Sequence, residues 1–396
     1  MSKRAIILVL DGVGVGALPD ASNYGDIGSN TISNVARVVG GLKLPNLQKL
    51  GIGNIVKIQG VPENEENLAA FGKMAEIALD KDSSSGHWEI AGLEVKQKFP
   101  TYPNGFPCEI LDRFIELTNV PGVLCNKPYS GTEAIKDFGE EHIKTRKPIV
   151  YTSADSEFQI AAHEDVYPIE KLYEICHITR EQIFGGDPNI GRIIARPFLG
   201  NDKDDFYRTG NRKDYSVAPP RDTLLDIIKK SGLEVAGVGK IEDLFDFNGL
   251  TKSIHTKTNQ EGIEQTIAYL QEIDSGLIFI NLVDFDSKWG HRNDAEGFAK
   301  GLEYFDSSLP GILANLKDED LLFITADHGC DPTMPGTDHT REYIPLLVYG
   351  KNILGTDLGI RSTFSDIAAT ISDFLKVEMP ENGTSFLKDL QKKIEE

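Results

Sequence analysis

The chain has 396 residues, of which 40% are hydrophobic and 26% are charged, and its 61 acidic residues outnumber its 41 Lys and Arg to give a net charge of −20. This length exceeds what one compact core commonly holds, so we expect two domains in a globular protein. The acidic balance argues against a nucleic-acid partner, because phosphate neutralisation requires a basic face. A small anionic substrate remains compatible with it, because a metal and a few Arg or Lys side chains concentrate positive charge locally.

Neither a signal peptide nor a membrane span is predicted. The apolar run at residues 5–10 is short and is followed by a glycine turn, and no later segment approaches twenty apolar residues. The four cysteines form no C-x-x-C motif (Cys108, Cys125, Cys176 and Cys330), which favours reduced thiols in a cytosol. We therefore expect a cytoplasmic protein without a membrane partner, in which Cys330 is a packed thiol and not a ligand.

The first predicted strand, residues 5–10, ends in a carboxylate and a glycine-rich turn. Asp11 is followed by Gly12, Gly14 and Gly16. A dinucleotide fingerprint requires the spacing G-x-G-x-x-G, and Asp11 would stand where the cofactor phosphates bind, so we reject a nicotinamide cofactor. Ligands of open α/β sheets gather outside the carboxyl ends of strands, which makes Asp11 a candidate site residue.

A helix is predicted at residues 28–39, and a run of three serines follows the strand-like residues 68–78. The run stands between an Asp and a Gly-His pair and comprises Ser83, Ser84 and Ser85. One interpretation is a nucleophile at a helix N-terminus, where backbone N–H groups and the helix dipole favour a bound phosphate. The other is ordinary N-capping by Ser and Asp. The segment alone leaves both interpretations open.

The composition changes from about residue 96, where a stretch rich in Pro and aromatic side chains begins. A predicted helix at residues 168–184 and a predicted strand at 191–198 complete an inserted α/β module. The end of this module is basic, with Arg192 and Arg196 flanking the apolar middle of the strand. Charge runs are usually solvated faces, but Arg is also the preferred side chain for binding phosphate. The predicted domains are a core of residues 1–95 and 216–396 and a cap of residues 96–215.

The alternation of strands and helices resumes near residue 219. Strands are predicted at residues 234–239, 277–283, 321–326 and 344–349, with helices at 222–230, 260–273, 295–309 and 362–374. Alternating βα units indicate a mostly parallel sheet with helices on both faces. The predicted fold class is therefore α/β.

Carboxylates and histidines follow three of the predicted strands. The set comprises Asp11, Asp286, His291, Asp327, His328 and His339. Turn-forming residues with incidental histidines explain one such pair, but the same pattern after three strands is hard to assign to chance. Six ligands exceed the needs of one tetrahedral zinc and suit two divalent ions that clamp a phosphoryl or sulfuryl group and activate a serine hydroxyl. No G-x-S-x-G elbow surrounds the serines, which argues against a Ser-His-Asp hydrolase.

These motifs together resemble the alkaline phosphatase superfamily and, within it, the phosphopentomutase family. The motifs are Asp11-Gly-Val-Gly14, Lys81-Asp82-Ser83-Ser-Ser-Gly86-His87-Trp88-Glu89, Asp286 with His291, and Asp327-His328-Gly with Asp338-His339-Thr340. Matches at Tyr151-Thr-Ser-Ala-Asp155, Gly191-Arg192 and Asn382-Gly383-Thr384 extend the resemblance over essentially the whole chain. The resemblance implies an alkaline-phosphatase-like core with a smaller inserted α/β cap.

The resemblance also implies a reaction. A phosphopentomutase is an isomerase that interconverts α-D-ribose 1-phosphate, or its 2-deoxy analogue, with the 5-phosphate. The reaction passes through a phosphorylated nucleophile and a ribose 1,5-bisphosphate, and a sugar bisphosphate serves as primer. The nucleophile, usually threonine in the family, falls on Ser83. Closure of the cap would keep water away from the phosphoserine.

The same resemblance implies which residues bind metal and substrate. Two divalent ions, usually manganese, would be held by Asp11, Asp327 and His328 and by Asp286, His291 and His339. The phosphosugar would contact Asp155, Arg192, Ile194, Arg208 and Lys240.

Three alternatives fit part of the pattern. A phosphatase, sulfatase or phosphodiesterase would use the same metals but has no need of a basic cap. A cofactor-independent phosphoglycerate mutase shares the metals and the nucleophile and differs in substrate. A non-catalytic metal- or nucleotide-binding module would leave the serine next to six ligands without a role.

Overall fold

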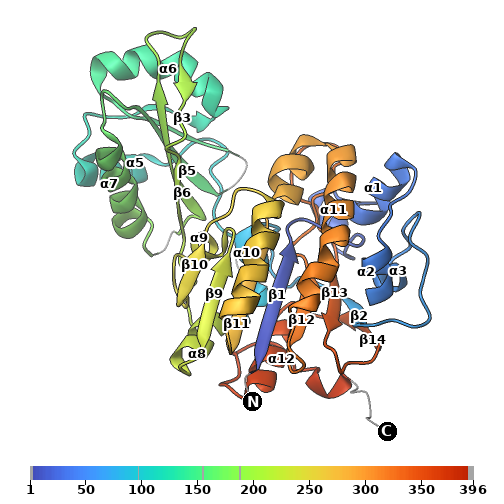
Figure 1. The fold of residues 1–396 in the computed structure, drawn as a ribbon. Helices are drawn as coiled ribbons and strands as arrows, with labels where there is room; N and C mark the ends of the chain where they lie inside the picture. Colours follow the sequence, from blue (N-terminus) through green and yellow to red (C-terminus); the bar gives the residue numbers. More distant parts are fainter. Residues whose placement is uncertain (1–2, 97, 154–155, 187–188, 391–396) are drawn as a thin grey trace. The chain divides into compact units, whose positions relative to one another are not determined.

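The computed structural model describes residues 3–96, 98–153, 156–186 and 189–390 (Figure 1). The chain forms two compact units, which we call the core unit (residues 1–97 and 219–396) and the cap unit (residues 98–218). Within the described residues, no helix combines the length and the apolar character needed to cross a membrane.

The core unit is built on an eight-stranded sheet in the order β10-β9-β11-β1-β12-β13-β2-β14. The strands are β1 Arg4–Leu10, β2 Ala70–Met74, β9 Glu234–Val238, β10 Lys252–Ile254, β11 Gly276–Leu282, β12 Leu321–Thr325, β13 Ile344–Tyr349 and β14 Asp357–Arg361. β13 is antiparallel to β12 and β2, and the other neighbouring pairs are parallel. The prediction of a mostly parallel α/β sheet is confirmed.

The central strands are continuous apolar runs because helices cover both faces of this sheet. Every residue of β1, β11 and β12 is buried. Gly262 of α10 (Asn259–Glu272) packs on Leu282 of β11, whereas His87 of α4 (Ser83–Ile90) stacks on Phe279 of the same strand. Successive strand residues point to opposite faces, so α10 and α4 lie on opposite sides of the sheet.

The remaining helices of the core unit complete these two layers. Figure 1 shows α10 and α11 side by side across the sheet. The helices are α1 Thr31–Val39, α2 Pro45–Leu50, α3 Ile52–Ile55, α8 Leu224–Lys230, α9 Ile241–Leu244, α11 Ala295–Ala314 and α12 Asp366–Leu375. α12 begins at Asp366 and not at residue 362, because the Thr363 and Ser365 hydroxyls donate to the Glu89 carboxylate and carbonyl.

The cap unit contains a six-stranded sheet in the order β3-β4-β5-β6-β7, with β8 also paired to β6. Its strands are β3 Leu124–Pro128, β4 Ile149–Thr152, β5 Glu157–His163, β6 Arg192–Leu199, β7 Tyr207–Arg208 and β8 Lys213–Ser216. Its helices are α5 Cys108–Thr118, α6 Gly131–Thr145 and α7 Ile169–Ile178, and α7 continues as a π-helical turn over Thr179–Ile183.

The two faces of the cap sheet differ in character. Phe158 and Ile193 face an aromatic core that includes Phe114 and Phe184. The alternate residues of β5 and β6 point to the other face. This face is polar near Glu157 and Arg192, and it is apolar where Ala161 and Phe198 pack with Ile135 of α6. Glu157 lies opposite Arg192, Gln159 opposite Ile194, and Ala161 opposite Arg196 in the parallel register of these strands.

Candidate active site

Three adjacent parallel strands deliver the candidate ligands to one edge of the core sheet. β1 lies between β11 and β12, with Leu10 opposite Leu282 and Val9 opposite Thr325. Asp11 follows β1 directly, and Asp327 and His328 follow β12. Asp286 lies in the π-helical turn Phe285–Trp289 and His291 in the 3-10 turn Gly290–Arg292, both of which follow β11. All six predicted ligands, His339 included, come together there.

Asp11, Asp327 and His328 form one compact group. Nε2 of His328 lies 3.5 Å from Oδ1 of Asp11 and 3.4 Å from Oδ2 of Asp327. All three side chains are buried, and one possible ligand atom from each lies within 4.8 Å of the others. A single cation could therefore contact all three.

Asp286 is the centre of the second group. Its Oδ1 lies 3.2 Å from Nε2 of His291 and 3.2 Å from Nε2 of His339. The His339 ring also lies 3.9 Å from the His328 ring, centroid to centroid. The two groups are thus contiguous, as expected if two ions share one site.

The polar atoms of this site fit a metal centre. Four atoms there are buried and have no hydrogen-bond partner within the part of the chain that the structure describes: Oδ1 of Asp11, Oδ1 of Asp286, Oδ2 of Asp327 and Nε2 of His339. Unpaired buried polar atoms are costly, and carboxylate oxygens with imidazole nitrogens are ligands of divalent cations. The residues present therefore fit a pair of such ions.

The pKa values reflect burial and the close spacing of the charged groups in this site. Burial, followed by the neighbouring Asp327 and Asp286 carboxylates, raises the pKa of Asp11 well above its usual value. Burial lowers the pKa of His328 to about 4. Burial also acts to lower the pKa of His339, but the Asp286 carboxylate outweighs it together with other acidic groups and raises that pKa to about 9. A bound cation would displace this proton and stabilise the carboxylates.

A second layer of side chains orients the ligands. Asn281 is the second-last residue of β11. Its Nδ2 donates to Oδ2 of Asp11 over 3.0 Å and lies 3.2 Å from Nε2 of His87. Nδ1 of His87 lies 2.8 Å from the carbonyl oxygen of Ser83 and 3.2 Å from Oδ2 of Asp327. Such contacts hold metal ligands in their orientation. Sequence reasoning gave no role to Asn281, although a polar residue inside an apolar strand is a usable signal.

The serine run forms the first turn of α4, and its three serines make different contacts. The Asp82 carboxylate caps the helix by accepting from the backbone N–H groups of Ser84 and Ser85, and the Ser85 hydroxyl donates to it over 2.7 Å. Ser85 is fully buried. The Ser83 hydroxyl instead lies 3.2 Å from Nε2 of His328. N-capping by Asp82 is therefore observed, and Ser83 is the member of the run whose hydroxyl lies at the candidate ligands. Its role as a nucleophile stays a prediction.

Gly86 allows α4 to approach the ligand loop closely. A Cβ atom at this position would lie 2.2 Å from the carbonyl oxygen of Asp327. Lys81, which precedes α4, forms ion pairs with two segments. Its Nζ lies 3.1 Å from Oδ2 of Asp26 and 3.1 Å from Oδ2 of Asp338, and Asp338 belongs to the ligand loop. The position of Ser83 is therefore set by contacts with the loop that carries His328 and His339.

Cys330 is packed beneath the centre. Its side chain is 1% exposed, and added Cβ atoms at Gly12 and Gly290 would both lie within 3 Å of it. Burial raises the pKa of its thiol well above the usual value. These contacts favour a neutral, space-filling thiol.

The candidate substrate residues lie in two places. Lys240 follows β9 in the core unit, and its charge lowers the pKa of Asp11. Arg192, Ile194 and Arg208 belong to the cap sheet, and Asp155 lies outside the described residues. Arg192 pairs with Glu157 over 2.5 Å.

One corner of the cap sheet gathers groups suited to an anion. The Tyr151 hydroxyl is buried and has no hydrogen-bond partner in the described residues. A Cβ atom at Gly131, the first residue of α6, would lie 2.4 Å from this hydroxyl and 1.9 Å from Nη2 of Arg208. Burial raises the pKa of Tyr151, and the charges of Arg196 and Arg208 act against this rise. Sequence reasoning did not identify Tyr151 or Gly131 as members of this group.

Comparisons with known proteins show the family of this chain. Residues 3–379 match the model of the Metalloenzyme superfamily. The chain is 53% identical to the phosphopentomutase of Clostridium novyi over 99% of this chain and 100% of that protein. It is 55% identical to the phosphopentomutase of Caldanaerobacter subterraneus, and this match covers 100% of both chains.

A solved structure is similar in fold at low sequence identity. The phosphoglycerate mutase of Leishmania mexicana matches with a TM-score of 0.51 and 14% identity over 97% of both chains. At this identity the likeness concerns the fold alone.

Proposed function

The chain belongs to the phosphopentomutase family of the Metalloenzyme superfamily, and from this premise we propose that it interconverts ribose 1-phosphate, or its 2-deoxy analogue, with the 5-phosphate. The family places it among the isomerases. The observation that carries the proposed chemistry is the Ser83 hydroxyl, which lies 3.2 Å from Nε2 of His328 at the edge of a buried ligand cluster.

Two divalent ions, which we propose to be manganese, would be held by two sets of three ligands. Asp11, Asp327 and His328 would hold one ion, and Asp286, His291 and His339 the other. Bound there, such ions supply Lewis-acid stabilisation of phosphoryl oxygens and lower the pKa of a serine hydroxyl.

The chain's own residues prepare Ser83 for phosphoryl transfer. Nδ1 of His328 lies 3.1 Å from the carbonyl oxygen of Gly329, an acceptor, which leaves Nε2 as the unprotonated nitrogen on the side of Ser83. Ser83 also stands at the N-terminus of α4, where the helix dipole favours a phosphate group.

Phosphoryl transfer then proceeds in two balanced steps. A free sugar hydroxyl attacks the phosphorus of phosphoserine 83, a new P–O bond to the sugar forms, the bond to Oγ of Ser83 breaks, and the proton of the sugar hydroxyl passes to Oγ. The resulting ribose 1,5-bisphosphate reorients, and Oγ attacks its other phosphorus. The bond from that phosphorus to the sugar oxygen breaks, and the proton passes back to this oxygen. A sugar bisphosphate primes the enzyme by phosphorylating Ser83 in the first place.

The distal phosphate requires cations that do not belong to the metal centre. We assign this role to Arg192 and Arg208, with Asp155, Ile194 and Lys240 completing the substrate contacts. The unpartnered Tyr151 hydroxyl beside Arg208 supports the assignment, since a phosphate oxygen would satisfy it.

Phosphorus NMR tests the proposal directly. Manganese-loaded protein is given ribose 5-phosphate and a trace of ribose 1,5-bisphosphate. The expected result is a growing ribose 1-phosphate resonance without net inorganic phosphate. Stoichiometric release of inorganic phosphate would contradict a mutase and would indicate a phosphatase that uses the same metal centre. Conversion of 3-phosphoglycerate instead would indicate a phosphoglycerate mutase.

A further inference from the structure

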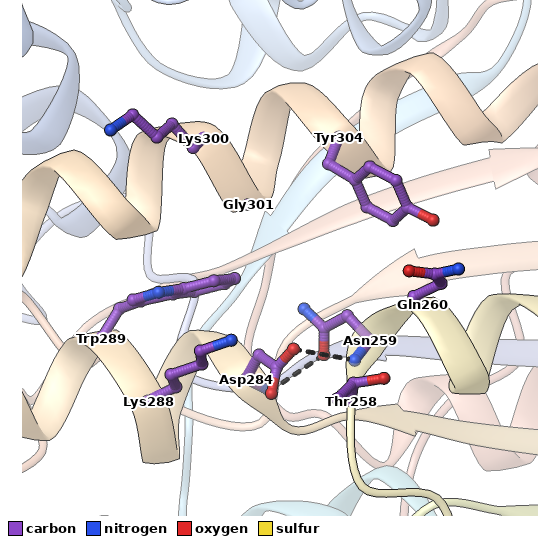
Figure 2. Close-up of a pocket in the computed structure, with 9 residues that line it drawn as sticks. All are labelled: Thr258, Asn259, Gln260, Asp284, Lys288, Trp289, Lys300, Gly301 and Tyr304. Carbon is purple, nitrogen blue, oxygen red and sulfur yellow. Dashed lines mark hydrogen bonds between the residues drawn. The ribbon is translucent and has the colours of Figure 1, made fainter.

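A cavity of about 270 Å³ opens on the flank of the core unit, in the layer of helices α10 and α11 (Figure 2). It is bordered by the N-terminus of α10, the turn after β11 and the middle of α11. Its lining comprises Thr258, Asn259, Gln260, Asp284, Lys288, Trp289, Lys300, Gly301 and Tyr304. No residue of this lining is one of the six candidate metal ligands, so the cavity is separate from the centre described above.

The floor of the cavity holds a buried donor without an acceptor. Asn259 is 3% exposed, and its Nδ2 has no hydrogen-bond partner among the described residues. Its Oδ1 accepts from the backbone N–H of Asp284 over 2.9 Å, which establishes which end of the amide faces inward. In Figure 2 the nitrogen end points into the space between Trp289 and Tyr304. A buried amide donor without a partner is costly, so this atom indicates an absent acceptor.

A carboxylate lies beside this donor. Oδ2 of Asp284 accepts the backbone N–H of Asn259 over 2.9 Å, so the N-terminus of α10 is already satisfied and does not itself call for an anion. The floor thus presents an amide N–H and a carboxylate next to each other. This pair complements a planar edge that carries one acceptor and one N–H donor, as amino-substituted nucleobases do.

Two aromatic rings border the cavity. The Trp289 indole lies flat against α11, because an added Cβ at Gly301 would be 2.2 Å from its six-membered ring. Tyr304, three residues further along α11, is 43% exposed. Exposed aromatic rings of this kind bind bases by stacking.

Two lysines provide positive charge at the rim. Lys288 and Lys300 both line the cavity and both are exposed. Nζ of Lys288 lies 5.5 Å from the centre of the Trp289 ring. Lys300 also lies 4.0 Å from a carboxylate oxygen of Glu296, so its ammonium group is shared with that residue. The cavity therefore offers a cation over the Trp289 ring and the carboxylate of Asp284 on its floor, which suits a ligand with both a phosphate and an amino group.

We propose that this cavity binds a nucleotide whose base carries an exocyclic amino group, with the base against Trp289 and Tyr304 and the phosphate at Lys288 and Lys300. The volume accommodates a base and part of its sugar and is just below the range common for small-molecule sites. Lys288 and Trp289 belong to the same turn as Asp286, so the proposed ligand would contact a segment that also carries a candidate metal ligand.

Isothermal titration calorimetry on the manganese-loaded protein tests the proposal. Saturating ribose 5-phosphate is included, so that a nucleotide phosphate cannot simply occupy the metal centre. Adenosine 5′-monophosphate is expected to bind saturably at one site per chain, and inosine 5′-monophosphate, which lacks the amino group, roughly tenfold more weakly. Absence of saturable binding, or equal affinity for the two nucleotides, would overturn the proposal.

Variants locate the binding site. Tyr304→Ala is expected to weaken binding about tenfold through loss of stacking, and Lys300→Ala about threefold at low salt. Lys144→Ala is the matched control, because both lysines follow a glutamate at i−4 in a helix and their side chains are 77% and 75% exposed. Unchanged affinity in Tyr304→Ala, with ribose 5-phosphate turnover intact, would place the nucleotide elsewhere and refute the assignment.

Discussion

Charged side chains gather in two regions of this molecule, and the two regions are neutralised in different ways. At the edge of the core sheet, Asp11, Asp286 and Asp327 are buried together, and one oxygen of each has no hydrogen-bond partner in the described residues. Negative charges that are buried close together are unfavourable unless a cation neutralises them. We propose that bound metal ions satisfy the unpaired atoms of this region.

On the polar part of the cap sheet, most charged groups are paired within the protein. Arg192 pairs with Glu157, and Nε of Arg196 donates to Gln159 over 3.0 Å. A substrate phosphate would therefore compete with these partners, and the Tyr151 hydroxyl, which has no hydrogen-bond partner in the described residues, could donate to it directly. Buried carboxylates with unpaired oxygen atoms therefore indicate a site for a permanently bound cation. A network in which most charged groups are already paired indicates a site for a ligand that binds reversibly.

The largest expected effect concerns the nucleophile at the metal edge. Ser83→Ala should reduce turnover by at least about a thousandfold while leaving the circular dichroism spectrum unchanged, because the hydroxyl that carries the phosphoryl group is lost. Ser84→Ala is the matched control and should retain activity. If Ser84→Ala or Ser85→Ala abolishes turnover instead, the nucleophile has been assigned to the wrong serine.

The second prediction concerns the pH dependence of the metal-free protein. The pKa of His339 is raised to about 9, so its proton stabilises the fold fully below pH 6.5 and this contribution is lost as the pH rises through 9. Chelated protein should therefore lose up to about 3 kcal/mol of unfolding free energy over this interval. Denaturant unfolding measures it.

The comparison with His339→Gln isolates this effect from other titrating groups. The chelated variant should lack the His339 part of the slope. Manganese-loaded protein should show the opposite trend, because metal competes with protons for the same nitrogen. Identical pH profiles for the chelated wild type and the chelated variant would show that His339 does not face Asp286 as described.

A smaller effect is expected for the side chains that orient the ligands. Asn281→Ala removes the donor to Asp11 and His87 and should weaken manganese affinity roughly 10- to 100-fold, with KM for the phosphosugar little changed at saturating metal. Thr266→Val is the control, because Thr266 is equally buried but donates only to Gly262 within α10. An equal loss of metal affinity in both variants would indicate a general packing effect.

The smallest effect is expected on the polar part of the cap sheet. Arg208→Ala should raise KM for ribose 5-phosphate about tenfold and leave manganese affinity unchanged, because it removes one of several cations near the distal phosphate. Arg113→Ala, an exposed arginine of α5, is the control. Parallel losses of metal and substrate affinity in Arg208→Ala would contradict the separation of the two regions.

Much of the core unit was predictable from local pattern. The strands that carry the ligands are buried on both faces and therefore read as unbroken apolar runs, each ending in a carboxylate. The cap unit was harder, and the helices α5 and α6 were not predicted. Their surroundings are rich in Pro and Gly, and the helical residues themselves bury only one narrow side.

Local sequence pattern could not distinguish the three adjacent serines from one another. Ser83, Ser84 and Ser85 are identical in type, and only the contact of α4 with the loop after β12 distinguishes them. Asn281 was overlooked for a related reason. Its amide matters because β11 lies beside β1, and strand order is set by packing between distant segments.

The class of fold, the family and the residue types of the candidate metal centre could be inferred from the sequence alone, because periodicity and motifs are local properties. Only the tertiary structure decided which serine faces the ligands, which side chains orient them, and that a donor on the floor of the α10–α11 cavity has no acceptor. These depend on distances between residues far apart in the chain, and such distances follow from how strands order and helices pack.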